Sequence, residues 1–213
     1  MNIFPPDLPK QLAEGVDFLD KLSREDRLEE AVYTGQNFCG ENLKNLEAVR
    51  CRFIKCDFSE ANLAFAGFRD VVFEACDFSN SDLNKASFQR VVFAHCKLMG
   101  MDFVEGSMHH ARFTECDARY LNVADSKVQN VAFESTRLEN ASFLRCRMKA
   151  QFSHCNLTQT MFEQTPLKEF DLRTCRLEGV QVTPSDLRGA IVTPLQASEL
   201  AVLLGLIIKE QEE

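Results

Sequence analysis

The nine cysteines of this 213-residue chain are the residues that could take part in the most kinds of chemistry. No Cys-x-x-Cys pair occurs, so the usual spacing of a zinc site is missing. The start of the chain, MNIFPPDLPK, lacks a basic segment followed by an apolar run, which argues against a secreted disulfide scaffold. Eight of the nine, all except Cys39, fall at one recurring position of a short repeat. We interpret them as compact buried apolar side chains, and Cys39 as an exposed one.

Histidines and paired carboxylates are the other candidates for chemistry. No histidine stands in register with a serine or cysteine nucleophile as a triad would require. A metal-ligand pair at His109 and His110 is possible, but solvated surface residues are the simpler interpretation. Carboxylates such as Asp77 and Asp82 recur with the repeat, so they are weak evidence for acid–base work, and no nucleotide-binding or HExxH motif occurs. The sequence thus predicts a protein that is not an enzyme, without cofactor or metal. The four histidines are His95, His109, His110 and His154.

The charge balance limits the classes of partner. The chain has 24 Lys and Arg against 32 Asp and Glu, a net charge of -8. This excess of acid argues against direct binding of nucleic acid through phosphate neutralisation and favours basic partners or basic grooves. The longest apolar stretch, LAVLLGLII at 200–208, is far short of the roughly 20 residues that span a bilayer. We therefore expect a soluble cytoplasmic protein with no membrane association.

The elements that must position these residues follow from a five-residue period. Counting in steps of five from Tyr33 to Met148, and again from Phe152 to Leu187 after the loss of one residue, gives 32 positions that are all apolar. A second position, two residues before each of these centres, is mostly small, as at Cys76 and Ala86. Neither a helix of period 3.6 nor a strand of period 2 produces this pattern.

Two inward residues in every five require a corner in each pentapeptide, and four corners make a coil of 20 residues. About eight such coils, stacked through parallel hydrogen bonds at about 4.8 Å per layer, give a rod of roughly 40 Å. The prediction is an all-β solenoid in which like residues form columns. The core ladder comprises Phe53, Phe73, Phe93, Phe113, Phe133 and Phe152, beside the cysteine column Cys56, Cys76, Cys96 and Cys116.

This pattern resembles the pentapeptide-repeat family, whose consensus is A(D/N)LXX, over about residues 31–187. The resemblance implies a right-handed quadrilateral β-helix. We expect an N-terminal cap at 1–30, the repeat at 31–192, and a C-terminal helix with a dimerisation tail at 193–213. In the N-terminal part, Asp7 could open a short helix that runs through Glu14, and Ser23 to Asp26 resembles a capping box.

The C-terminal segment VTPLQASELAVLLGLII predicts a capped helix. Thr193 is the expected N-cap, Pro194 the first helical residue and Gly205 the stop, with Glu199 too late for a capping box. Leu206, Ile207 and Ile208 then read as a short strand-like run.

The same segment, with FEACDFSN at 73–80, resembles the quinolone-resistance (Qnr-type) branch of the family. That resemblance implies two rods joined end to end as a homodimer through their C-terminal helices. The residues expected in this contact are Leu195, Leu200, Leu203, Leu204, Leu206, Ile207 and Ile208.

The Qnr-type resemblance further implies binding to a type II topoisomerase, DNA gyrase or topoisomerase IV, where DNA would lie, with protection from quinolones or natural gyrase poisons. DNA carries one charge per about 1.7 Å, so a rod of net charge -8 would need its acids gathered on one face. A scaffold for protein–protein interaction without a topoisomerase role is the alternative. The residues expected to face the enzyme are Asp57, Asp77, Asp82, Asp102, Asp117 and Tyr120.

Overall fold

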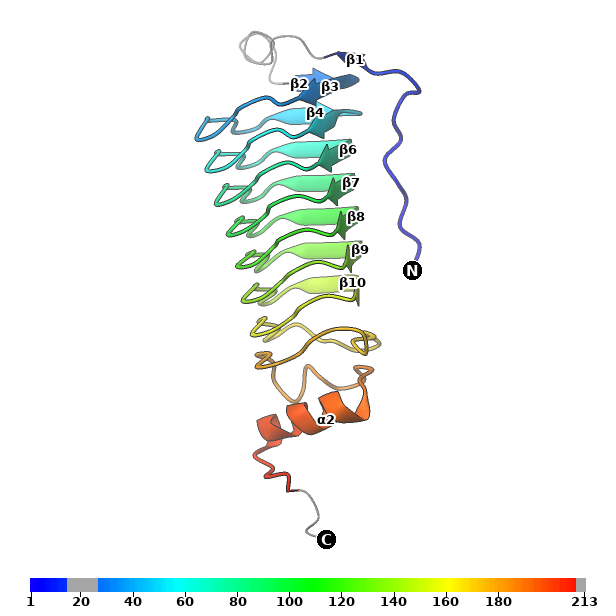
Figure 1. Ribbon diagram of the computed structural model, residues 1–213, viewed down its shortest axis with the longest axis vertical. Helices are drawn as coiled ribbons and strands as arrows, with labels where there is room; N and C mark the ends of the chain where they lie inside the picture. Colours follow the sequence, from blue (N-terminus) through cyan, green and yellow to red (C-terminus); the bar gives the residue numbers. More distant parts are fainter. Residues whose placement is uncertain (15–26, 210–213) are drawn as a thin grey trace.

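The five-residue period folds into a rod of stacked coils whose neighbouring strands run parallel (Figure 1). The structure, a computed structural model, describes residues 1–14 and 27–209. Strands pair with the strands of the next coil, as in the registers Phe73↔Phe93 and Phe93↔Phe113. The fold is a β-solenoid of about six turns with one short C-terminal helix. The predicted fold class is thereby confirmed.

The described strands are short at the start of the rod and longer in its middle. From β6 onward each strand runs through a corner and along parts of two faces. The bounds are β1 Ala13–Glu14, β2 Arg27–Glu29, β3 Ala31–Thr34, β4 Glu47–Val49, β5 Arg52–Ile54, β6 Gly67–Glu74, β7 Ser87–Ala94, β8 Ser107–Thr114, β9 Lys127–Glu134 and β10 Arg147–Ser153, followed by α2 Pro194–Ala201 and the 3-10 turn η1 Val202–Leu204.

A residue in the left-handed backbone conformation forms each corner of the coil. Every fifth residue from Glu30 to Arg145 has a positive φ, between 49° and 69°. For a non-glycine residue this conformation costs on the order of 1–2 kcal/mol, and most of these corners are not glycine. The buried core and the hydrogen bonds between coils must therefore offset a cost that recurs at each pentapeptide.

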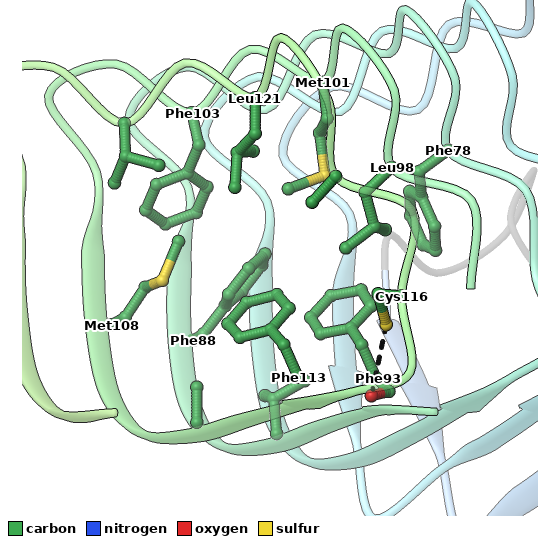
Figure 2. Packing of buried hydrophobic residues seen from close by; sticks show 14 of the residues in the cluster. Phe78, Phe88, Phe93, Leu98, Met101, Phe103, Met108, Phe113, Cys116 and Leu121 are labelled. Atoms are coloured by element: carbon green, nitrogen blue, oxygen red, sulfur yellow. Dashed lines mark hydrogen bonds between the residues drawn. The ribbon is translucent and has the colours of Figure 1, made fainter. Parts of the chain in front are cut away.

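The interior is a stack of flat rings. Phe93 lies between Phe73 and Phe113, with ring centroids 4.8 and 4.9 Å apart and nearly parallel planes. All six phenylalanines of the core ladder are buried. Figure 2 shows Phe78, Phe88 and Phe103, which project inward from other faces of the coils and fill the rest of the interior.

Cysteines occupy the small inward position as neutral hydrogen-bond donors. Cys116 Sγ donates to Phe93 O at 3.5 Å (Figure 2), and Cys76 and Cys96 make the equivalent bond to Phe53 O and Phe73 O. Burial raises the pKa of the Cys146 thiol to about 11, so this thiol stays protonated at neutral pH. Eight cysteines are buried and only Cys39 is exposed.

The strand-bearing part has about six turns, whereas about eight coils were expected. Beyond Ser153 the ladder continues only as isolated bridges, such as Asn156↔Arg176 and Asp171↔Ile191. The backbone N–H of Arg147 donates to the previous coil, at Ser126 O. Pro166, one coil further, has no N–H to donate, so regular pairing stops there.

The N-terminal residues do not form the helix expected from Asp7 to Glu14; they run as an arm beside the rod (Figure 1). Leu8 precedes Pro9, which disfavours the helical backbone. The rod supplies partners instead, because the Asp7 N–H donates to Asp70 Oδ1 at 2.8 Å and Ala13 pairs with Ala31. The capping box expected at 23–26 lies outside the described residues.

Helix α2 starts at Thr193 and Pro194 as expected, but it does have a capping box. The third helical residue is Gln196, whose Oε1 accepts from Thr193 N at 2.8 Å while Thr193 Oγ1 accepts from Gln196 N. Gly205 follows with φ 74°, as the stop required. Leu206, Ile207 and Ile208 form no strand, because no described strand lies beside them to pair with. None of the described helices is long and apolar enough to cross a membrane.

Candidate interaction surfaces

The outward side chains form columns, because residues of successive coils lie directly beside one another. Asp82 is bridged to Asn62 on one side and Asp102 on the other, and Asn122 follows Asp102. Two aspartates are therefore direct neighbours, at about the 4.8 Å layer spacing. Like charges opposite each other on neighbouring strands are destabilising.

Aspartate and asparagine accept the same turn hydrogen bond at several positions of this column. Asp82 Oδ1 accepts from Asn84 N at 2.9 Å, and Asn62 Oδ1 makes the same bond with Ala64 N at 3.1 Å. Asn122 does so as well, with Ala124 N at 3.2 Å. The turn after Asp82 therefore needs a side-chain oxygen but no charge. Asp102 differs, because its two carboxylate oxygens accept from Asn122 Nδ2 at 3.0 Å and Asn84 Nδ2 at 3.3 Å. Folding thus gives a reason for the carboxylate at 102 but none for the charge at 82.

A second column, Asp57, Asp77, Lys97, Asp117 and Arg137, is acidic only at one end. Asp77 is next to Asp57 and is bound by Lys97 Nζ at 3.2 Å. Burial alone would raise the pKa of Asp77, but hydrogen bonds from Ser79 and Lys97 outweigh it and hold this pKa below its usual value.

Asp117, farther along, is neutralised by cations. Arg119 and Arg137 lie 2.7 and 3.6 Å from it, and the hydrogen bond from Arg119 lowers its pKa. Tyr120, at the corner that follows, is 58% exposed. The six residues expected on one binding surface thus divide into the acidic pair Asp82–Asp102, the pair Asp57–Asp77 that Lys97 partly neutralises, and a zwitterionic site around Asp117.

Sequence reasoning missed a cationic aromatic corner. Phe65 is half-exposed, and the Nζ atoms of Lys44 and Lys85 lie 5.3 and 5.6 Å from its ring centroid. Both distances suit a cation–π contact. These residues are far apart in sequence, and only the five-residue register could have placed them together.

Two of the four histidines contact other groups of the protein. His95 Nδ1 lies 3.2 Å from Glu115, and His110 Nδ1 accepts from the Phe4 N–H at 3.4 Å. Within residues 1–14 and 27–209, no three His, Cys, Asp or Glu side chains are grouped to hold a metal ion.

The C-terminal end of the rod exposes a large apolar surface. Leu195, Leu204 and Ile207 are 71%, 64% and 86% exposed, and Leu203, Leu206 and Ile208 are exposed as well. Leu200 instead packs partly against the core. A groove beside the helix is lined by Leu187, Ala190, Val192, Leu200, Leu203 and Leu204.

Gln196 anchors this end to the coils. Its side chain is buried, and Nε2 donates to Leu172 O at 2.9 Å and to Cys175 O at 2.8 Å. The helix therefore closes the core through a polar contact and leaves much of its apolar surface uncovered.

Comparison with known proteins identifies the repeat. A family profile described as "Pentapeptide repeat region" matches residues 86–151, and one described as "Pentapeptide repeats (8 copies)" matches residues 66–103. No curated protein sequence matches the chain.

Among solved structures, the chain is similar to QnrB1, described as a plasmid-mediated fluoroquinolone resistance protein. The identity is 20% over 86% of this chain and 100% of that one, with a TM-score of 0.41. It is also similar to HetL, described as involved in heterocyst differentiation regulation, from the cyanobacterium Nostoc sp. strain PCC 7120. There the identity is 17% over 78% of this chain and 89% of that one, with a TM-score of 0.30. Neither likeness assigns a role to this chain.

Proposed function

We propose that this rod, whose residues 66–151 match pentapeptide-repeat profiles, binds a type II topoisomerase, DNA gyrase or topoisomerase IV, as a non-enzymatic mimic of DNA. In this proposal the acidic pairs Asp82–Asp102 and Asp57–Asp77 occupy basic sites that otherwise hold DNA phosphates. Binding there would relieve inhibition by quinolones or natural gyrase poisons.

The observation that carries the proposal is the stacking of Asp82 on Asp102. Asparagine at the position of Asp82 makes the same turn, so this charge is unnecessary for the fold, and its place beside the charge of Asp102 is unfavourable. Charges that a fold does not require are more readily explained by a partner of opposite charge, where they steer association and set specificity.

The local charge density limits what this mimicry can be. Neighbouring carboxylates stand about one layer, 4.8 Å, apart, whereas DNA carries one charge per about 1.7 Å. The rod can therefore imitate a few phosphates at fixed positions but not a continuous duplex. Tyr120, at the corner after Asp117, would add an exposed aromatic contact near those positions.

We also propose that two copies pair end to end through the apolar C-terminal surface. Contiguous exposed apolar residues, Leu195, Leu204 and Ile207 among them, mark interaction surfaces in soluble proteins. Pairing of the two identical ends would bury the surface once on each copy, as a two-fold interface requires.

The test is gyrase supercoiling in the presence of a fluoroquinolone, with this protein titrated in. Recovery of supercoiling is expected at low protein concentration, with inhibition at high concentration as the rod competes with DNA. The D82N variant keeps the turn hydrogen bond from Asn84 N and should need about tenfold more protein for the same recovery.

The matched control is D125N, which removes the same charge from an aspartate that pairs with Arg145. Its titration should match that of the unaltered protein. An identical response of both variants would refute the role of the Asp82–Asp102 pair, and no effect of the unaltered protein would refute topoisomerase protection.

A scaffold for protein–protein interaction is the second candidate. The observation that favours it is Phe65 between Lys44 and Lys85, a cationic aromatic corner that a DNA mimic does not need. Competition between this protein and DNA for gyrase separates the two candidates, since a scaffold would leave DNA binding unchanged.

A further inference from the structure

Many cations of the rod pair with the opposite charge one coil away. Examples are Lys85 with Glu105 at 3.5 Å, and Arg145 with Asp125 at 2.6 Å. Arg90 binds Asp70 in the same way, through two bonds of 2.6 Å. Opposite charges on neighbouring strands stabilise a sheet, so this arrangement is what folding favours.

One face near the C-terminal end breaks this rule. Lys127 is in direct register with Arg147, and Lys149 is one coil before Lys168 because the register of this coil is offset by the lost residue. Lys168 in turn lies beside Gly189, which Arg188 directly precedes, and the adjoining Glu169 N donates to Gly189 O at 2.9 Å. We call these five residues the basic strip: Lys127, Arg147, Lys149, Lys168 and Arg188.

All five side chains of the basic strip are exposed, and none has a carboxylate within 4.0 Å among the described residues. Adjacent cations stand about 4.8 Å apart along the rod, and the two columns are two residues, about 6.6 Å, apart across it. Stacked like charges are unfavourable for folding. The strip is therefore a surface that only an anionic partner would explain.

The dimensions of the basic strip suit a short acidic peptide. Its three coil steps cover about 14 Å, which is the length of four or five extended residues. Proteins that bind single-stranded nucleic acid add aromatic side chains on which bases stack. The exposed aromatic residues of the described chain, Phe4, Phe65 and Tyr120, do not belong to this strip. The net charge of -8 also disfavours a nucleic acid.

The chain itself carries an acidic segment of this length. Residues 210–213 read Glu, Gln, Glu, Glu, and Lys209 separates them from the apolar residues Leu206, Ile207 and Ile208. Arg188 at the end of the basic strip also lines the apolar groove beside α2. The apolar groove adjoins the basic strip at Arg188, and in the same way the apolar residues 206–208 precede the acidic residues 210–213.

The direction of the chain indicates which copy supplies the segment. After η1 the described residues lead away from their own coils (Figure 1). To reach its own basic strip, the chain would have to reverse within a few residues. In an end-to-end pair, the same direction carries the segment toward the last coils of the second copy.

We propose that the acidic segment at 210–213 of a second copy binds the basic strip, while its Leu206, Ile207 and Ile208 pack into the apolar groove. The proposal rests on the end-to-end pairing proposed above and adds an ionic contact to it. We call this contact between residues 210–213 and the basic strip the clasp. In a two-fold pair the contact forms twice. Two clasps add electrostatic attraction, so the dimer should weaken as salt rises.

Sedimentation equilibrium of the full chain at low and high salt tests the clasp. K149E/K168E should raise the dimer dissociation constant by at least about tenfold, and most of this effect should disappear at about 1 M salt. The matched control K55E/R69E changes the net charge equally at the other end of the rod and should leave the constant unchanged. Equal effects of the two variants would overturn the proposal.

Disulfide trapping identifies the copy, with Cys39→Ser as background because Cys39 is exposed. A mixture of separately prepared K168C and E212C chains should form a disulfide-linked pair on mild oxidation with oxidised glutathione. A disulfide within the K168C/E212C chain, with none in the mixture, would overturn the proposal in favour of the chain's own segment.

Two further outcomes separate this proposal from the proposed function. A stable dimer that gives no disulfide in either experiment would overturn the clasp and leave the pairing standing. A protein that is monomeric throughout would overturn both, whatever its effect on gyrase. Binding of duplex DNA that K149E/K168E abolishes, with an unchanged dimer, would overturn the clasp in favour of nucleic acid.

Discussion

Phe93→Ala should be among the most destabilising single changes in the rod. The ring is fully buried, and it stacks on Phe73 and Phe113 at 4.8 and 4.9 Å. Truncation of a buried phenylalanine costs about 3–5 kcal/mol. Two stacked pairs, each contributing about 0.5–1.5 kcal/mol, place this site near 4–5 kcal/mol. Phe170 provides the comparison, since it is 7% exposed and has one ring contact at 6.1 Å.

Urea unfolding followed by far-ultraviolet circular dichroism measures the effect. We expect Phe170→Ala to cost about 3 kcal/mol, the low end of the range for such truncations. Because a solenoid is stabilised by contacts between neighbouring coils, Phe93→Ala should also lower the m-value as the two halves of the rod unfold separately. A loss below about 2 kcal/mol at Phe93, or a smaller loss than at Phe170, would refute the assignment of the ring stack as the main source of stability.

Three further predictions concern polar groups. Cys96→Ser should cost about 1 kcal/mol or less in urea unfolding, because Ser126 donates to a carbonyl from the equivalent position, whereas Cys96→Leu should cost about 1–3 kcal/mol through overpacking. Burial alone would raise the pKa of Asp70, but hydrogen bonds from Arg90 and the Asp7 N–H outweigh it and hold the pKa low. The stability from this group should thus be present above the unfolded pKa of about 3.9 and be lost as pH falls through the folded pKa, a pH dependence that Asp70→Asn should remove. Gln196→Leu should cost about 2–4 kcal/mol, since it leaves two carbonyls without their donor, and limited proteolysis should then cleave the C-terminal helix sooner.

The rod could be predicted from the sequence because every coil buries side chains at the same positions of the five-residue repeat. An apolar residue at every fifth position and a small one two residues earlier directly identify the buried side chains, Phe93 and Cys96 among them. The capping residue Thr193 and the stop at Gly205 could also be predicted, because both act through local backbone geometry. Pro9 after Leu8 is a local signal against the helix expected from Asp7, but the contact that replaces it, with Asp70, lies 63 residues away and could not be predicted locally.

By itself, the sequence determined which side chains point inward and how many residues make a coil, because burial and corner geometry recur with a period short enough to read. The twenty-residue coil also places Asp82 beside Asp102, as the structure confirms. Only the tertiary structure decided how the segments outside the repeat meet the rod. The Asp7 N–H binds Asp70, and Gln196 binds Leu172 O and Cys175 O, through contacts between distant residues that no local pattern encodes.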